Sequence, residues 1–207
     1  MTVYAGYGAS IKKSGTSTGF TGEDMTNTAG FTWQIDTATK QVWDKAVVPT
    51  FYLDAVEIDA NDVSSVDYLY GKVTFTGVQD GVVTVDGNYY PMSEIAGAKE
   101  ISLVMTSAIH DKTDTSNAGY IERMYGIHDV SVDLGRFDDI SKDFTDIIQS
   151  RTSIVLEVAP ESSYSMRGWF IADSSGQSLD VNSLIEEGLN FQLDGDEEVG
   201  KTFSTSS

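Results

Sequence analysis

The chain has 207 residues, with 32 acidic and 13 basic side chains, and a formal net charge of −19 at pH 7. Such a surface repels phosphate backbones, which argues against conventional nucleic-acid binding but does not exclude DNA passing nearby. Without cysteine there is no disulfide framework and no thiolate metal site, which favours assembly inside a cell. At 40% hydrophobic residues the chain is expected to fold, and neither a signal peptide nor a membrane span is predicted.

The first part of the chain predicts an arm followed by short strands. Residues 1–30 are rich in Gly, Ser and Thr and show little periodicity, so they predict an extended N-terminal arm that ends near Met25. Residues 32–35 and 41–44 predict two short strands. The link between them, residues 36–40, is rich in turn formers and can hold one helical turn.

Two hairpins are predicted between residues 50 and 90. Strand signals at 50–53 and 56–58 flank Asp54-Ala55, a hairpin tip in which alanine tolerates positive φ less well than glycine. Asp86-Gly87 is a pair typical of tight hairpin turns, and it lies between β-rich residues 82–85 and 88–90.

The next segments alternate between apolar and polar residues. Residues 99–106 predict a long strand with Ile101, Leu103 and Met105 on one face. Residues 111–119 are polar and predict a loop. Residues 166–172 and 188–193 predict two further strands.

The chain is organised around a strand, helix and strand between residues 127 and 158. Residues 130–134 alternate as a half-buried strand does, and residues 154–158 resume that alternation. A helix is predicted at 139–149 because its apolar residues recur at i, i+4, i+7 and i+8. These candidate core residues of the helix are Ile140, Phe144, Ile147 and Ile148.

Many strands and one clear helix predict a mainly β protein, a β-sandwich or barrel with one flanking α-helix. No sequence repeat and no internal linker rich in Pro or Gly interrupts the chain. We therefore expect a single domain over residues 31–200, between the arm at 1–30 and a disordered tail at 201–207.

Motifs with chemical meaning are weak in this sequence. Residues 195–202 match the phosphate-loop pattern G-x-x-x-x-G-K-T, but only five residues follow Thr202, too few for the helix that such a loop needs. His110 and His128 lack metal-ligand spacing. Residues 59–62 and 173–180 could wrap calcium, although their Asx residues are more typical of turns. No catalytic, cofactor or metal site is predicted, and the chain is not expected to be an enzyme.

Several segments, spread over most of the chain, together resemble the sequences of one protein family and occur in the same order. They are residues 20–23, 35, 40–44, 66–75, 83–93, 126–132, 136–137, 167–170 and 186–191. In these segments the chain resembles the tail tube (major tail) proteins of long-tailed bacteriophages with non-contractile tails. Asp54-Ala55 departs from the Asp-Gly expected at that hairpin, which leaves its turn type open.

The resemblance implies a β-sandwich with a flanking helix that assembles into hexameric rings. The rings stack into a hollow tube, in which inner strands pair into a continuous β-barrel around the path of the DNA. It also implies a location in the virion tail after assembly in the host cytoplasm, with other tail proteins such as the tape measure and tail terminator as partners. No cofactor is implied.

Four side chains are candidates for the lining of such a tube. Glu100 and Asp133 are the leading ones, because each lies on the polar face of an alternating strand whose other face is apolar. Asn190 and Gln192 follow from the same logic. The alternative is that these side chains face solvent outside and that acidity only keeps an abundant protein soluble.

Two other classes of function remain open. The first is a carbohydrate-binding or hydrolytic β-sandwich that uses carboxylates and the tyrosines at positions 68, 70, 89 and 90, although cross-strand aromatic pairs are the commoner use of such residues. The second is an adhesin or pilus-like structural subunit.

Overall fold

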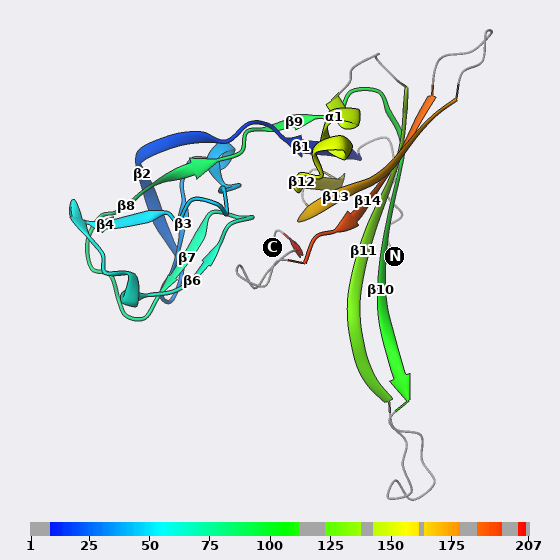
Figure 1. Ribbon diagram of the computed structural model, residues 1–207. Coiled ribbons are helices and arrows are strands. Elements are labelled where there is room, and N and C mark those ends of the chain that lie inside the picture. The colour runs from blue at the N-terminus through cyan, green and yellow to red at the C-terminus, as the bar shows by residue number, and fades with distance from the viewer. Residues whose placement is uncertain are drawn as a thin grey trace, which may run out of the picture. The chain divides into compact units, whose positions relative to one another are not determined.

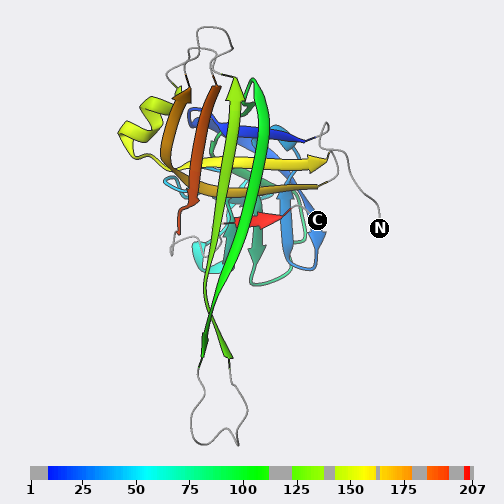
Figure 2. The same cartoon turned by 90° about the vertical axis from the view of Figure 1, so that its right-hand side faces the viewer.

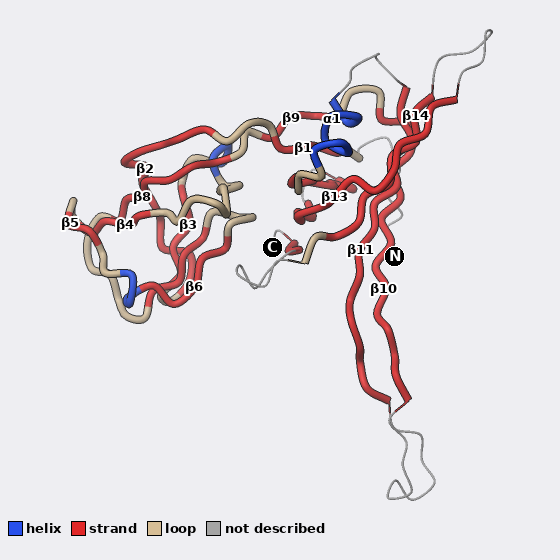
Figure 3. The backbone as a smooth tube through the Cα atoms, in the orientation of Figure 1, coloured by secondary structure: helices blue, strands red, loops and turns tan. Residues whose placement is uncertain are grey.

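A computed structural model describes residues 9–111, 123–137, 143–161, 164–178, 186–195 and 203–205. The fold is mainly β, with antiparallel sheets and one α-helix among these residues (Figures 1 and 3). The chain divides into two compact units. Unit 1 comprises residues 1–95, 154–169 and 195–207, and unit 2 comprises residues 96–153 and 170–194. No helix in the described part of the chain is long and apolar enough to cross a membrane.

Unit 1 contains a seven-stranded antiparallel sheet with the order β5-β4-β8-β2-β3-β7-β6. Its strands are β2 (Thr18–Ala29), β3 (Thr32–Ile35), β4 (Thr50–Leu53), β5 (Val56–Glu57), β6 (Val63–Asp67), β7 (Lys72–Phe75) and β8 (Val83–Tyr89). Two short 3-10 helices, η2 (Ala38–Lys40) and η3 (Ala60–Asp62), lie in its connections.

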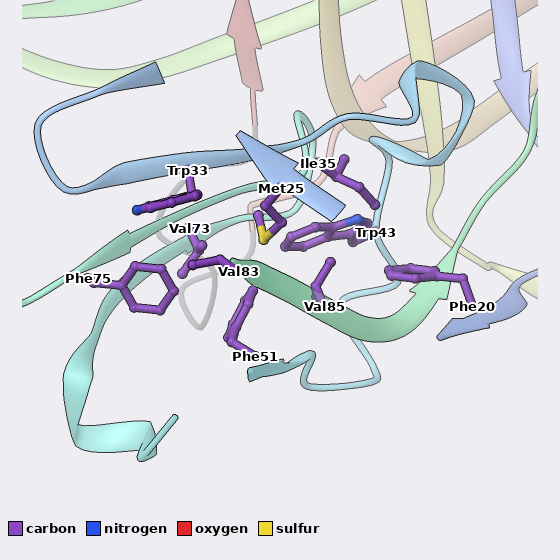
Figure 4. Packing of buried hydrophobic residues seen from close by; sticks show 10 residues of the cluster. All are labelled: Phe20, Met25, Trp33, Ile35, Trp43, Phe51, Val73, Phe75, Val83 and Val85. Atoms are coloured by element: carbon purple, nitrogen blue, oxygen red, sulfur yellow. The ribbon is translucent and has the colours of Figure 1, made fainter. Parts of the chain in front are cut away.

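The side chains of this sheet meet in a core of ten buried residues (Figure 4). Aromatic rings follow one another through it, with centroids 6.1 Å apart between Trp43 and Phe51 and 5.8 Å apart between Phe51 and Phe75. The ten residues are Phe20, Met25, Trp33, Ile35, Trp43, Phe51, Val73, Phe75, Val83 and Val85.

The rest of unit 1 is a second set of strands. They are β1 (Ser10–Ser14), β9 (Met92–Glu94), β12 (Ile154–Glu161), the first residues of β13 (Tyr164–Ser178) and β15 (Phe203–Thr205). Strand β1 pairs antiparallel with both β12 and β9, and β15 pairs with β13. Trp169, Val155 and Leu69 are buried in a smaller apolar cluster here.

Unit 2 consists of a sheet and the helix. Its strands are β10 (Ala98–Asp111), β11 (Arg123–Phe137), β14 (Glu186–Leu193) and the remainder of β13, in the order β10-β11-β14-β13. Helix α1 (Asp143–Ser150) packs on one face, where the rings of Phe144 and Phe191 lie 5.8 Å apart edge to face. Residues 130–137 of β11 alternate between buried and more exposed side chains, as predicted for residues 130–134.

Most of the predicted strands are present, and the hairpin tip at Asp54-Ala55 is confirmed. Leu53 pairs with Val56, and the two residues between them have φ angles of 49° and 66°. The one-turn helix expected in the link 36–40 is η2. Of the loop predicted at 111–119, Asp111 is the last residue of β10, and residues 112–119 lie outside the described residues.

The prediction of an N-terminal arm is wrong for residues 10–14 and 18–29, which form β1 and β2. Phe20 and Met25 are buried although they are an odd number of residues apart. A shift in the pairing with β8 between Phe20 and Glu23, where Gly22 has a φ of 64°, turns both side chains into the core. This bulge breaks the alternation that would have revealed a strand.

Three further expectations also fail. Asp86-Gly87 is not a turn, because both residues lie inside β8, where Asp86 pairs with Thr50. Residues 41–44 form no strand, and only Trp43 makes an isolated bridge, to Tyr89. In the tail expected to be disordered, residues 203–205 pair with β13. The single domain expected over residues 31–200 stays a prediction beside the division into two units.

Candidate assembly surface

The four candidate lining residues lie on three neighbouring strands of unit 2. Asp133 on β11 pairs directly with Asn190 on β14, and Gln192 follows two residues later on the same face. Glu100 on β10 is the pairing partner of Gly135, which lies two residues from Asp133. Figure 2 shows these three strands side by side. The structure therefore brings together side chains that are up to 92 positions apart, since 192 − 100 = 92.

Hydrogen bonds connect part of this group. The side-chain nitrogen of Asn190 donates to Oδ1 of Asp133 at 2.6 Å, and that of Gln192 donates to Oδ1 of Asn190 at 2.8 Å. Glu100, Asp133 and Asn190 line a shallow cavity of about 330 Å³. Glu100 and Asp133 are both exposed, so this face presents negative charge to its surroundings. We name it the acidic face.

Three glycines cross the acidic face in one row. Gly135 on β11 pairs with Gly188 on β14, which pairs in turn with Gly176 on β13. A Cβ added at Gly176 or Gly188 would meet no atom within 4 Å. The row keeps this part of the face free of side chains.

The opposite face of the same sheet is buried over β11 and β14. Val132 and Phe191, which pair across β11 and β14, are completely buried, and the ring of Phe144 from the helix packs on that of Phe191. Since neighbouring residues of a strand point to opposite faces, burial of this face fixes the exposure of Asp133 and Glu100 on the other.

The outer edge of the sheet is open. Strand β10 is the last strand in the order, and within the described residues only β11 pairs with it. Three of its apolar side chains are largely exposed, with Val104 at 44%, Met105 at 60% and Ile109 at 60% of their full accessible area. An edge strand with exposed apolar groups is a template on which another strand can pair.

The predicted core helix is partly described. Phe144 is 1% exposed, whereas Ile147 and Ile148 are half-buried. Ile140 and Asp139 lie outside the described residues. The role of the four residues as a common core stripe stays a prediction.

A buried ion pair was missed by the sequence analysis. Arg136 on β11 and Glu187 on β14 are both 3% exposed, and Nη2 of Arg136 lies 2.6 Å from Oε2 of Glu187. The guanidinium group also lies 4.9 Å from the ring centre of Phe144. The alternation of Glu187 with Leu189 and Phe191 was a signal for this pair, because it places the carboxylate on the covered face.

The tyrosines proposed for sugar stacking are used in packing. Burial raises the pKa of Tyr70 to about 12, against a smaller lowering effect of the nearby Arg167 charge. Tyr90 packs edge to face on Trp169 at 5.8 Å, and Tyr89 packs in the same way on Phe20 at 6.0 Å. Tyr68 is half-buried against the ten-residue core. They do not form an exposed aromatic strip.

Of the two calcium-loop candidates, residues 59–62 include a turn, whereas residues 173–178 of the second lie in strand β13. Asp59 caps η3, since its Oδ1 accepts a hydrogen bond from the backbone nitrogen of Asn61 at 2.8 Å, which is an Asx turn. Among the described residues, no group of three or more potential metal ligands occurs. The side chains of both histidines and residues 196–202 of the phosphate-loop pattern lie outside the described part of the chain.

Comparison with known proteins yields only distant likenesses. No known family profile and no curated protein match the sequence. Among solved structures, the chain is similar to the tail of an empty gene transfer agent particle computed with C6 symmetry. The identity is 15% and the TM-score 0.49, over 56% of this chain and 87% of that chain. A chain from the virion of a native gene transfer agent particle is 18% identical with a TM-score of 0.47, over 56% of this chain and 89% of that one. Values this low do not establish a shared fold.

Proposed function

We propose that this chain is a structural subunit of a phage-type tail tube, in which hexameric rings stack around the path of double-stranded DNA. The observation that carries the proposal is the sheet of unit 2. It has one covered apolar face, one exposed acidic face and one open edge. The collinear sequence resemblance to tail tube proteins supports the same function.

The open edge supplies a means of assembly. Strand β10 spans 14 residues, and its unpaired backbone groups can be bonded by a strand of a neighbouring copy. Met105 and Ile109 would be buried in such a contact, which favours association through the hydrophobic effect. Repetition of a head-to-tail contact of this kind closes a ring when the rotation allows it.

The acidic face supplies the property that a conduit needs. A wall that presents Lys or Arg to DNA releases counterions on contact and holds the duplex, whereas carboxylates do not. Around a ring, Glu100 and Asp133 would be repeated in every copy, and a lining of one sign in a narrow channel concentrates its repulsive potential. Lys99, near the start of β10, forms an ion pair with Glu186, in which its Nζ lies 2.7 Å from Oε1. In this proposal Asn190 and Gln192 line the tube beside them.

The proposal places the protein in the virion tail after assembly in the host cytoplasm. Other tail proteins, such as the tape measure and tail terminator, are its further partners, and it has no enzymatic role.

Electron microscopy of the purified chain tests the function. Rings or hollow tubes are expected, and a monomer that binds glycans would instead support the carbohydrate-binding alternative.

The lining is tested by replacing Glu100 and Asp133 together with lysine. Tubes are expected to form, while DNA passage through them slows, more so at low salt, where charges are less screened. A matched control replaces Glu57 and Asp80, two exposed acidic residues of unit 1, with lysine. Normal passage through intact tubes of the first variant would contradict the assignment of the lining, and loss of its tubes would place the two residues at a subunit contact.

A further inference from the structure

A cavity of about 460 Å³ in unit 1 is lined by both charged and apolar side chains. Its charged lining consists of Lys12 on β1, Glu157 on β12 and Arg167 on β13. Val42 and Met92 are among its apolar lining residues. It lies apart in the sequence from every residue assigned to the acidic face.

Two cations of the cavity share one carboxylate. Lys12 Nζ donates to Oε1 of Glu157 at 2.8 Å, and Nε of Arg167 donates to its Oε2. Burial alone would raise the pKa of Glu157, but the hydrogen bonds and charges of Lys12 and Arg167 outweigh it, so the pKa is lowered. The carboxylate is therefore ionised at neutral pH, and the three groups together carry one net positive charge.

The cation on β13 is held in place. Nη1 of Arg167 donates to the backbone oxygen of Leu69 at 3.0 Å, and its guanidinium carbon lies 4.9 Å from the ring centre of Tyr70. The Lys12 side chain keeps 35% of its accessible area, so the side chain is accessible from outside. A fixed cation beside an accessible one is suited to binding an anion with little loss of side-chain entropy.

We propose that this cavity binds the carboxylate of an Asp or Glu side chain from a second copy of the chain. The proposal rests on the proposed function, because it requires that copies associate. Each copy carries 32 acidic and 13 basic side chains, so two copies repel each other unless acidic groups of one meet basic groups of the other. The single negative charge of an Asp or Glu side chain balances the net positive charge of the cavity. The methylene groups of that side chain can pack on the apolar lining residues.

One group of the same copy opposes this binding. Lys12 lies between two acidic cross-strand neighbours, Glu157 on one side and the exposed Glu94 on β9 on the other. Glu94 is not part of the cavity lining, but its charge repels an incoming anion. Removal of that charge should therefore strengthen binding.

Titration with butyrate tests the cavity in the separate subunit. Butyrate has the carboxylate and apolar stem of a glutamate side chain, and butyramide is the neutral control of the same size. We expect butyrate, but not butyramide, to shift the amide resonances of β1 and β9. Lys12→Gln should weaken butyrate binding about tenfold, the size expected for a hydrogen bond to a charged group. Glu94→Gln should strengthen it, and absence of butyrate binding to the unaltered chain overturns the proposal.

Assembly tests the identity of the occupant. Lys12→Gln should raise the critical concentration for assembly about tenfold, whereas Lys12→Arg should restore it because the charge is retained. Lys13→Gln is the matched control, since it removes the same charge one residue along β1, on the other face of the strand. Thermal melting shows whether each variant is folded.

The outcomes separate the two proposals. If the unaltered chain never assembles, the proposed function fails and the second copy is overturned as the occupant, while the butyrate titration still reports on the cavity. If the chain assembles and Lys12→Gln behaves as Lys13→Gln does, only the carboxylate contact is overturned.

Discussion

The two units use their strands differently. In unit 1 the seven-stranded sheet and Trp43 from one of its connections direct ten side chains into one enclosed core. In unit 2 only one face of the sheet is covered, where Phe144 from the helix packs on Phe191. The other face is exposed. An enclosed core stabilises a subunit by itself, whereas an exposed face and an open edge are free for contacts with other molecules. The proposed strand pairing between copies and the proposed lining therefore both depend on unit 2.

Truncation of one core ring in each unit gives the largest expected effects. Phe144→Ala should cost about 3–5 kcal/mol in unfolding free energy, because the side chain is 1% exposed and leaves a cavity against Phe191. Hydrogen exchange should show lost amide protection in β11 and β14 and retained protection in β2 and β8. Phe75→Ala should produce the reverse pattern. Equal loss in all four strands for either variant would show that the units unfold as one block.

Removal of one charge from the buried pair of unit 2 should have a comparable effect. Arg136→Met leaves Glu187 buried without its cation, which typically costs about 3–5 kcal/mol. Adding Glu187→Leu should recover much of the loss, since an apolar pair needs no desolvated charge. Urea unfolding of the single and double variants measures this difference, and a double variant no more stable than the single one would argue against a charge effect.

Acid should weaken unit 1 through carboxyl groups with lowered pKa values, namely Glu23, Asp44 and Glu157. Burial alone would raise the pKa of Asp44, but hydrogen bonds from Ser17, the Ala46 backbone and Tyr90 lower it below its ordinary value of 3.8. The stability that the ionised Asp44 carboxylate contributes is fully present above its ordinary pKa of 3.8. This stability is lost as the pH falls through the lower pKa of the folded state.

The Asp44 contribution can be isolated by substitution. Asp44→Asn should cost about 1–3 kcal/mol at neutral pH by weakening these hydrogen bonds, and it should flatten the loss of stability in acid. Thermal melting of unit 1 between pH 7 and pH 2, followed by the amides of β8, measures both effects. An unchanged acid profile would show that Asp44 is not among the groups that matter.

The smallest effect is expected on the acidic face. Gly188→Ala should change subunit stability by no more than about 0.5 kcal/mol, since the new Cβ meets nothing within 4 Å. Gly71→Ala in unit 1 is the contrasting control, because Gly71 has a φ of 59° and its Cβ would lie 2.7 Å from Ile35. Thermal melting compares the two. A large loss for Gly188→Ala would mean that the glycine row is required by the subunit itself.

Local sequence by itself determined much of β10, β11 and β14 and the polar face of each, but it missed residues 173–178 of β13. The alternation of Glu100 and Ser102 with Ile101 and Leu103 identifies a strand with one polar side, and a period of two fixes which side each residue takes. The same reasoning placed Asp133, Asn190 and Gln192 on polar faces. No single segment predicts that β10, β11 and β14 are neighbours or that their polar residues share one face of the sheet.

The tertiary structure decided what depends on distant partners. Asp86-Gly87 has the local signature of a turn, but the Asp86 carboxylate accepts a hydrogen bond from Gly22, and a Cβ at Gly87 would lie 3.3 Å from the ring of Phe20. Asp86 and Gly87 therefore contact β2 from within strand β8 and form no turn. Strand β1 was equally invisible, because its place depends on pairing with β12, about 145 residues away along the chain. Periodicity reports the environment of each residue along its own segment, whereas pairing partners and close approaches are set only when the chain has folded.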